Sequence, residues 1–139
     1  MKITYSTTVE LPTVTIIFKK EGYTHLHYKN KILSLADNKK IFETVRKNTP
    51  WEKCPFLITG EENAEHDKES KAFNVSDLVT KHMSAQAFVV KSASQKIAYN
   101  LYIKFFRPKT PFKVFTIESE ATEWLKPFIG DNKFTENND

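Results

Sequence analysis

Short apolar runs alternate with longer amphipathic segments along the chain, most clearly in its C-terminal half. Residues 85–90 form an apolar run that is too short for a buried helix and rich in β-branched and aromatic side chains, which predicts a buried strand. A helix is predicted over residues 94–106, because Pro108 cannot continue a helical hydrogen-bond ladder. A second strand over residues 113–116 completes a βαβ crossover, which places the two strands parallel in one sheet.

The predicted helix over residues 94–106 carries more apolar side chains than packing on a sheet requires. Its polar residues form one narrow stripe, whereas a helix on a sheet buries an apolar stripe about 100° wide. The excess could lie at the edges of a packed helix, because apolar atoms are common on ordinary surfaces. It could equally be covered by a second subunit, an apolar ligand or the C-terminal helix, and the candidates for this interface or ligand site are Tyr99, Tyr102, Ile103 and Phe106.

The N-terminal half predicts an antiparallel hairpin followed by a helix. In residues 13–19 and in residues 24–29, apolar side chains recur at every second position and so share one face of a predicted strand. Glu21–Gly22 form the turn between the two strands. Ser34 and Asp37 fit a capping box at the start of a helix. The remaining predicted elements are an edge strand over residues 3–9, a strand over 56–59, short helices over 68–73 and 77–82, and an amphipathic helix over 118–128.

The order of these elements predicts the fold class. A hairpin followed by alternating helices and strands indicates an α/β domain, in which helices pack on a mixed, mostly parallel β-sheet with an N-terminal antiparallel hairpin. A length of 139 residues fits a single domain, which we place at residues 1–130. Residues 131–139 are polar and are expected to form a C-terminal tail.

Composition and charge narrow the class of protein. Hydrophobic residues make up 40% and charged residues 27% of the chain, no apolar run could span a membrane, and the N-terminus lacks a signal-peptide core. The single cysteine, Cys54, cannot form an internal disulfide, so a cytoplasmic location is expected. The net charge is +4, but basic and aromatic residues are not interleaved along one platform, so we expect no nucleic-acid partner.

Candidate catalytic and metal-binding residues are sparse. Three glycines, at positions 22, 60 and 130, cannot make a Rossmann or P-loop phosphate-binding loop. His25 and His27 lie on one face of a predicted strand, but no third ligand has recognisable spacing, so we expect no metal. His66 lies in an acidic loop and Cys54 lacks a basic partner that would lower its pKa. We therefore expect neither an enzyme nor a cofactor.

The ends of the parallel strands offer one candidate anion site. Ligands of open α/β sheets bind outside the carboxyl ends of the strands, and a capped helix N-terminus can hold an anion. Ser92, Ser94 and Thr116 lie at these ends and are the candidate anion-binding residues. The alternative is that they only cap the helices that follow them.

Several motifs resemble one known family over nearly the whole chain. They are the Glu21–Gly22 hairpin turn, Asn100 with its apolar helix, Arg107-Pro108-x-x-Pro111, Phe115–Thr116 and Glu120-Ala121-x-x-Trp124-Leu125. Together they resemble small uncharacterised bacterial proteins described as STAS/SEC14-like, with a SpoIIAA-like (STAS-like) fold. The resemblance implies that fold for this chain.

The same resemblance suggests two functions. STAS-like domains imply a non-enzymatic regulatory or protein-interaction module, with a homodimer or another protein as partner. The alternative is a carrier of a small apolar ligand or lipid, because SEC14-type proteins hold lipids in an apolar cavity. SpoIIAA-type domains are phosphorylated on a serine in an Asp-Ser pattern, which is missing here, and the nearest phosphosite candidate, Ser70, has acidic neighbours that would repel a phosphate.

Overall fold

The computed structural model describes residues 6–130, with Phe106 described by its backbone alone. The predicted tail and the Phe106 side chain therefore lie outside the described residues. In chain order the elements are β1 (Thr7–Glu10), β2 (Val14–Lys19), β3 (Tyr23–Tyr28), β4 (Ile32–Leu33), α1 (Leu35–Asn48), β5 (Cys54–Gly60), β6 (Glu65–His66), α2 (Lys68–Asn74), α3 (Asp77–Thr80), β7 (Met83–Val89), α4 (Ala93–Phe106), β8 (Phe112–Phe115), α5 (Glu118–Leu125) and a 3₁₀ turn (Lys126–Phe128).

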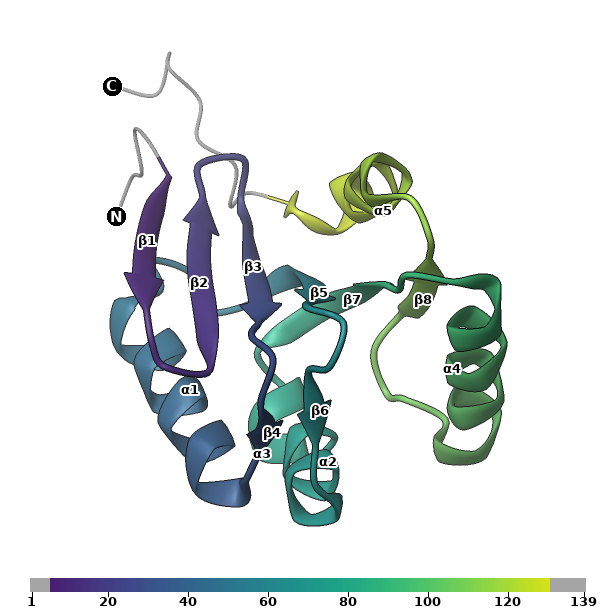
Figure 1. The fold of residues 1–139 in the computed structure, drawn as a ribbon. Coiled ribbons are helices and arrows are strands. Elements are labelled where there is room, and N and C mark those ends of the chain that lie inside the picture. Colours follow the sequence, from purple (N-terminus) through teal and green to yellow (C-terminus); the bar gives the residue numbers. More distant parts are fainter. Residues whose placement is uncertain (1–5, 131–139) are drawn as a thin grey trace.

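Six strands form one mixed sheet in the order β1-β2-β3-β5-β7-β8 (Figure 1). The pairs β1·β2 and β2·β3 are antiparallel, whereas β3·β5, β5·β7 and β7·β8 are parallel. The prediction of a mostly parallel sheet with an N-terminal antiparallel hairpin is confirmed. The βαβ crossover is also confirmed, since β7, α4 and β8 follow one another and the two strands pair in parallel.

Alternating burial along β2 and β3 fixes which side of the sheet carries the larger core. Val14, Ile16 and Phe18 are buried on β2, and Leu26 and Tyr28 are buried on β3. Because successive strand side chains point to opposite faces, all five lie on one face. They form a single cluster with residues of α1, as the alternation in the sequence predicts.

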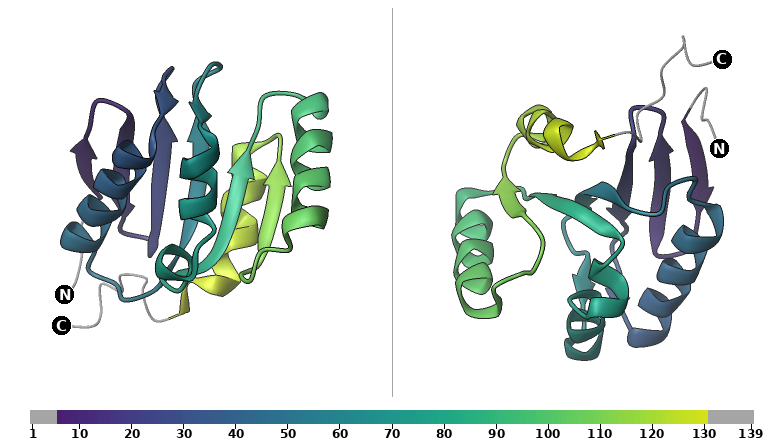
Figure 2. Two further views of the ribbon diagram at one scale, coloured as in Figure 1. Left: turned by 90° about the horizontal axis from the view of Figure 1, so that it is seen from below. Right: turned by 180° about the vertical axis from the view of Figure 1, so that it is seen from behind.

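The helices cover the two faces unequally. Figures 1 and 2 show α1, α2 and α3 below the sheet, α5 above it, and α4 on the lower side at the β8 edge. α5 packs on β5 and β7 through Ala121 and Leu125, which are fully buried against Leu57, Ala85 and Ala87. The core therefore has two parts, one on each face.

α4 packs only loosely against the rest of the domain. The helix of a βαβ unit ordinarily buries one stripe of apolar side chains against the sheet. None of its described side chains is buried. Its first turn is capped by Ser92, whose hydroxyl accepts from the N–H of Gln95 at 3.2 Å, so Ser94 lies inside the helix and not at its cap. Most of the described surface of α4 is therefore exposed, and the helix meets the sheet at its edge.

Local chemistry explains most other boundaries. The capping box at Ser34 and Asp37 is present in full, with Ser34 N–H donating to the Asp37 carboxylate at 2.8 Å. The loop over residues 60–67 contains an unpredicted strand, since β6 pairs in parallel with β4. The last helix ends at Leu125, earlier than predicted, because a 3₁₀ turn containing Pro127 follows it.

Candidate functional site

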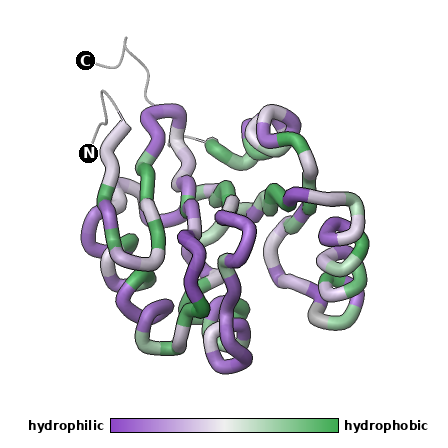
Figure 3. Tube along the Cα trace, viewed as in Figure 1, coloured by the Kyte–Doolittle hydropathy of each residue, from purple (hydrophilic) through white to green (hydrophobic). Residues whose placement is uncertain are grey.

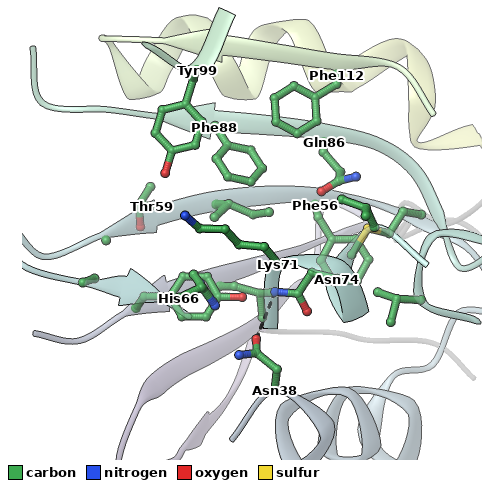
Figure 4. Close-up of a pocket in the computed structure, with 18 of the residues that line it drawn as sticks. Asn38, Phe56, Thr59, His66, Lys71, Asn74, Gln86, Phe88, Tyr99 and Phe112 are labelled. Atoms are coloured by element: carbon green, nitrogen blue, oxygen red, sulfur yellow. Dashed lines mark hydrogen bonds between the residues drawn. The ribbon is translucent and has the colours of Figure 1, made fainter. Parts of the chain in front are cut away.

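A pocket of about 390 Å³ lies on the lower side of the sheet, between α4 and the layer formed by α1, α2 and α3 (Figure 4). In Figure 2, α4 stands at the β8 edge and α2 lies toward the middle of the sheet, and the lining includes residues of β5, β7 and β8 as well as of these two helices. The volume falls in the range of ordinary small-molecule sites.

Aromatic side chains line the pocket on the side formed by the sheet and α4. Phe56 projects from β5, Phe88 from β7 and Phe112 from β8. The rings of Phe88 and Phe112 stack with centroids 4.6 Å apart, and the Tyr99 ring of α4 lies 5.5 Å from Phe88. These contacts make a continuous apolar surface that can take up an aromatic or aliphatic ligand.

The structure brings two of the four predicted α4 residues to the pocket. Tyr99 and Tyr102 line it, and burial raises the pKa of both hydroxyls. Ile103 is partly buried but is not part of the lining, and the Phe106 side chain is outside the described residues. Two of the four candidates therefore line a pocket, together with Gln95 and Ala98 of the same helix, and their role in binding stays a prediction.

Polar groups gather on the side of the pocket formed by β6 and α2. His66, Lys71 and Asn74 project from these elements (Figure 4). The Asn74 side chain donates to Asn38 Oδ1 at 3.0 Å, which holds the amide in place. Burial, together with the nearby charge of Lys71, lowers the pKa of His66 to about 4, so the imidazole is neutral near pH 7. Its Nδ1 atom is buried without a hydrogen-bond partner among the described residues.

The polar side of the pocket was not predicted as a site. His66 was considered only as an acid–base candidate in an acidic loop and was expected to be solvated, and Lys71 and Asn74 carried no distinguishing motif. Lys71 and Asn74 are three residues apart on one short helix, and this spacing is the local signal that they share a face. Which face meets the pocket depends on how α2 packs on α1, which is a long-range property.

The pocket reaches the carboxyl ends of β5 and β7, as expected for ligands of open α/β sheets. Gly60 and Lys91 line this end. Of the predicted anion-binding residues, Ser92 caps α4, Ser94 is exposed in its first turn, and Thr116 is exposed after β8. None of the three is part of the pocket lining, so the structure does not bring them together with it.

Ser70, the phosphosite candidate, is fully buried. Its side chain has 0% exposure, and its hydroxyl lies 2.7 Å from Asp67 Oδ1 and 3.0 Å from the Leu33 carbonyl oxygen. Its backbone N–H also donates to Asp67, which caps α2. A kinase could reach this hydroxyl only if α2 moved away, so the geometry gives Ser70 a structural role.

The histidine pair and the cysteine considered in the sequence analysis are not part of the pocket lining. The rings of His25 and His27 both reach the Thr59 hydroxyl, at 2.8 Å from Nε2 and 2.6 Å from Nδ1 respectively. Cys54 is buried, and burial raises the pKa of its thiol to about 11, so it is not a ready nucleophile. Within residues 6–130, no group of three or more histidine, cysteine or acidic side chains is arranged to bind a metal.

A second apolar surface lies on the outside of α4. Ile97, Leu101 and Phe105 are spaced four residues apart and are 63%, 52% and 84% exposed. This spacing places them in one stripe along the helix, and Figure 3 shows hydrophobic (green) positions along α4. We call it the outer stripe. No helix in the described part of the chain is long and apolar enough to cross a membrane.

Comparison with known proteins places the fold and the family. No curated protein matches the chain. A solved structure of an uncharacterised protein of the DUF3478 family, from Shewanella loihica PV-4, has a SpoIIAA-like fold and matches with a TM-score of 0.50 at 16% identity, covering 86% of this chain and 91% of that one. The fold is therefore SpoIIAA-like, as the sequence predicted. A family model described as a domain of unknown function, DUF7793, matches residues 17–129, and the chain belongs to that family.

Proposed function

We propose that this protein is a non-enzymatic module that binds a small apolar molecule in the pocket between α4 and α2. The observation that carries the proposal is the apolar pocket itself, in which the Phe88 ring contacts the rings of both Phe112 and Tyr99. Binding by such a surface is favourable because it removes apolar area from water. No covalent chemistry is required of the lining residues.

A pocket-filling substitution tests the proposal. N-phenyl-1-naphthylamine, a neutral fluorescent probe, should bind the wild-type protein with saturable fluorescence enhancement. Ala98 lines the pocket from α4, so Ala98→Trp should fill part of it and weaken the probe at least about tenfold, since a few lost apolar contacts are worth that much.

The matched control is Ala72→Trp, which adds the same side chain at an exposed position of α2 outside the lining. It should leave probe affinity within about twofold of wild type. Failure of the probe to bind, or equal effects of the two substitutions, would contradict the proposed function.

A second candidate function is protein docking through the outer stripe. Three large apolar side chains exposed in one row favour it, because contiguous exposed apolar surface commonly marks an interaction site. A homodimer or another protein would fit this role. The two candidates use different faces of α4, so a ligand in the pocket and a partner on the outer stripe could be bound together.

A further inference from the structure

The geometry points to a ligand with one anionic group attached to its apolar body, held by the Lys71 ammonium group at the polar side of the pocket. This inference rests on the proposed function, because it assigns a chemical class to the occupant of the same pocket. Three observations support it: the position of the Lys71 side chain, the absence of an ion pair between Lys71 and any carboxylate in residues 6–130, and the neutral polar groups on the same side of the pocket.

The Lys71 side chain extends from α2 into the pocket. Figure 4 shows its amine pointing toward the hydroxyl of Tyr99, which comes from α4 on the opposite wall. The ammonium group also lies near enough to His66 to influence the imidazole's protonation. A group placed between Lys71 and Tyr99 would therefore meet a positive charge and a hydroxyl donor.

No carboxylate in residues 6–130 forms an ion pair with Lys71. Two other cations of the pocket wall differ in this respect, because Arg46 pairs with Glu52 and Lys109 pairs with Asp77. Lys91, at the strand ends, likewise has no ion pair within the described residues. A positive charge that faces an apolar cavity without a counter-ion favours an anionic ligand group.

The acidic residues of the lining do not lie on α2 with Lys71. Glu61 and Glu62 follow β5 and are exposed, and Glu61 accepts from the backbone N–H of Asn30 at 2.8 Å. They leave the Lys71 charge unpaired. As like charges in the lining, they also disfavour a ligand with several negative charges, so the expected ligand carries one anionic group.

Neutral polar groups complete the environment for such a head group. The Asn74 amide is held by Asn38, and the neutral His66 imidazole lines the same side of the pocket. The opposite side of the pocket is lined by Phe56, Phe88 and Phe112. The ligand class that fits both sides is an amphipathic acid, with an aromatic or aliphatic body and one carboxylate or sulfonate.

Two probes that differ by one anionic group test the inference. 8-Anilino-1-naphthalenesulfonate is N-phenyl-1-naphthylamine with an added sulfonate. Lys71→Gln should weaken the sulfonate probe about fivefold and leave the neutral probe within about twofold, because a partly exposed charge pair contributes modestly to binding. Lys68→Gln, the same change on an exposed α2 residue outside the lining, should leave both probes unaffected.

The outcomes separate the two proposals. Binding of the neutral probe that Ala98→Trp weakens, combined with sulfonate binding that Lys71→Gln does not change, would overturn the anionic-group inference alone. Equal weakening of both probes by Lys71→Gln would also overturn it, because the lysine would then act through the shape of the pocket. Failure of both probes to bind would overturn the inference and the proposed function together.

Discussion

Ser70→Asp is expected to destabilise the protein by about 3–5 kcal/mol, a large fraction of the stability of a domain of this size. The substitution would bury a second carboxylate against Asp67, whose Oδ1 already lies 2.7 Å from the Ser70 hydroxyl, and against the Leu33 carbonyl oxygen. The site is fully buried, so water cannot screen the repulsion. Urea unfolding followed by circular dichroism measures the change.

Ser94→Asp is the matched control for this substitution. Ser94 is exposed in the first turn of α4, where a negative charge interacts favourably with the helix dipole, so the free energy of unfolding should change by less than about 0.5 kcal/mol. If Ser70→Asp were as stable as wild type, α2 would open easily. A kinase could then reach the Ser70 hydroxyl, and Ser70 would again be a candidate phosphorylation site.

Leu125→Ala is expected to cost about 2–5 kcal/mol, whereas Leu101→Ala should cost less than about 1 kcal/mol. Leu125 anchors α5 on the upper face of the sheet and is fully buried with Ala121 and Leu57, so its removal leaves a cavity. Leu101 lies in the outer stripe of α4 and is half exposed. The same chemical change therefore reports directly on how tightly each helix is attached.

Urea unfolding of the two variants checks this prediction. Equal losses of stability would show that α4 packs as firmly as α5, which would contradict the loose attachment that creates the pocket. A small effect of Leu125→Ala would contradict the assignment of the upper core to α5.

The sequence predicted those features that local patterns determine. Alternation at Val14, Ile16 and Phe18 identified the buried face of β2, and Ser34 with Asp37 identified the start of α1. Two prolines, Pro108 and Pro111, ended α4 and allowed the crossover to β8. These signals act within a few residues, so the chain carries them without reference to tertiary structure.

The pocket could not be predicted in the same way. Periodicity showed that α4 is too apolar, but not whether Tyr99 meets Phe88 or solvent. That depends on how α4 is placed against β7, which no local pattern specifies. Burial of Ser70 beneath Leu33 likewise joins residues 37 positions apart. The candidate site is therefore a product of long-range packing, whereas the fold is largely a product of local patterns.

The SpoIIAA-like relative is itself uncharacterised, so it supports the fold and leaves the function to the geometry of this chain. The geometry gives α4 two distinct faces. Tyr99 and Tyr102 face the pocket, and the outer stripe faces away from the domain. A small molecule bound beneath α4 would contact both the helix and the sheet, and would thereby couple pocket occupancy to the position of the outer stripe.

A methyl-labelled NMR titration with N-phenyl-1-naphthylamine tests the central claim most directly. Ile58 and Val79 line the pocket, whereas Ile97 and Leu101 belong to the outer stripe. The account predicts saturable chemical-shift changes at the methyl groups of Ile58 and Val79, and much smaller changes at those of Ile97 and Leu101. Absence of saturable changes at Ile58 and Val79, or changes confined to the outer stripe, would contradict it.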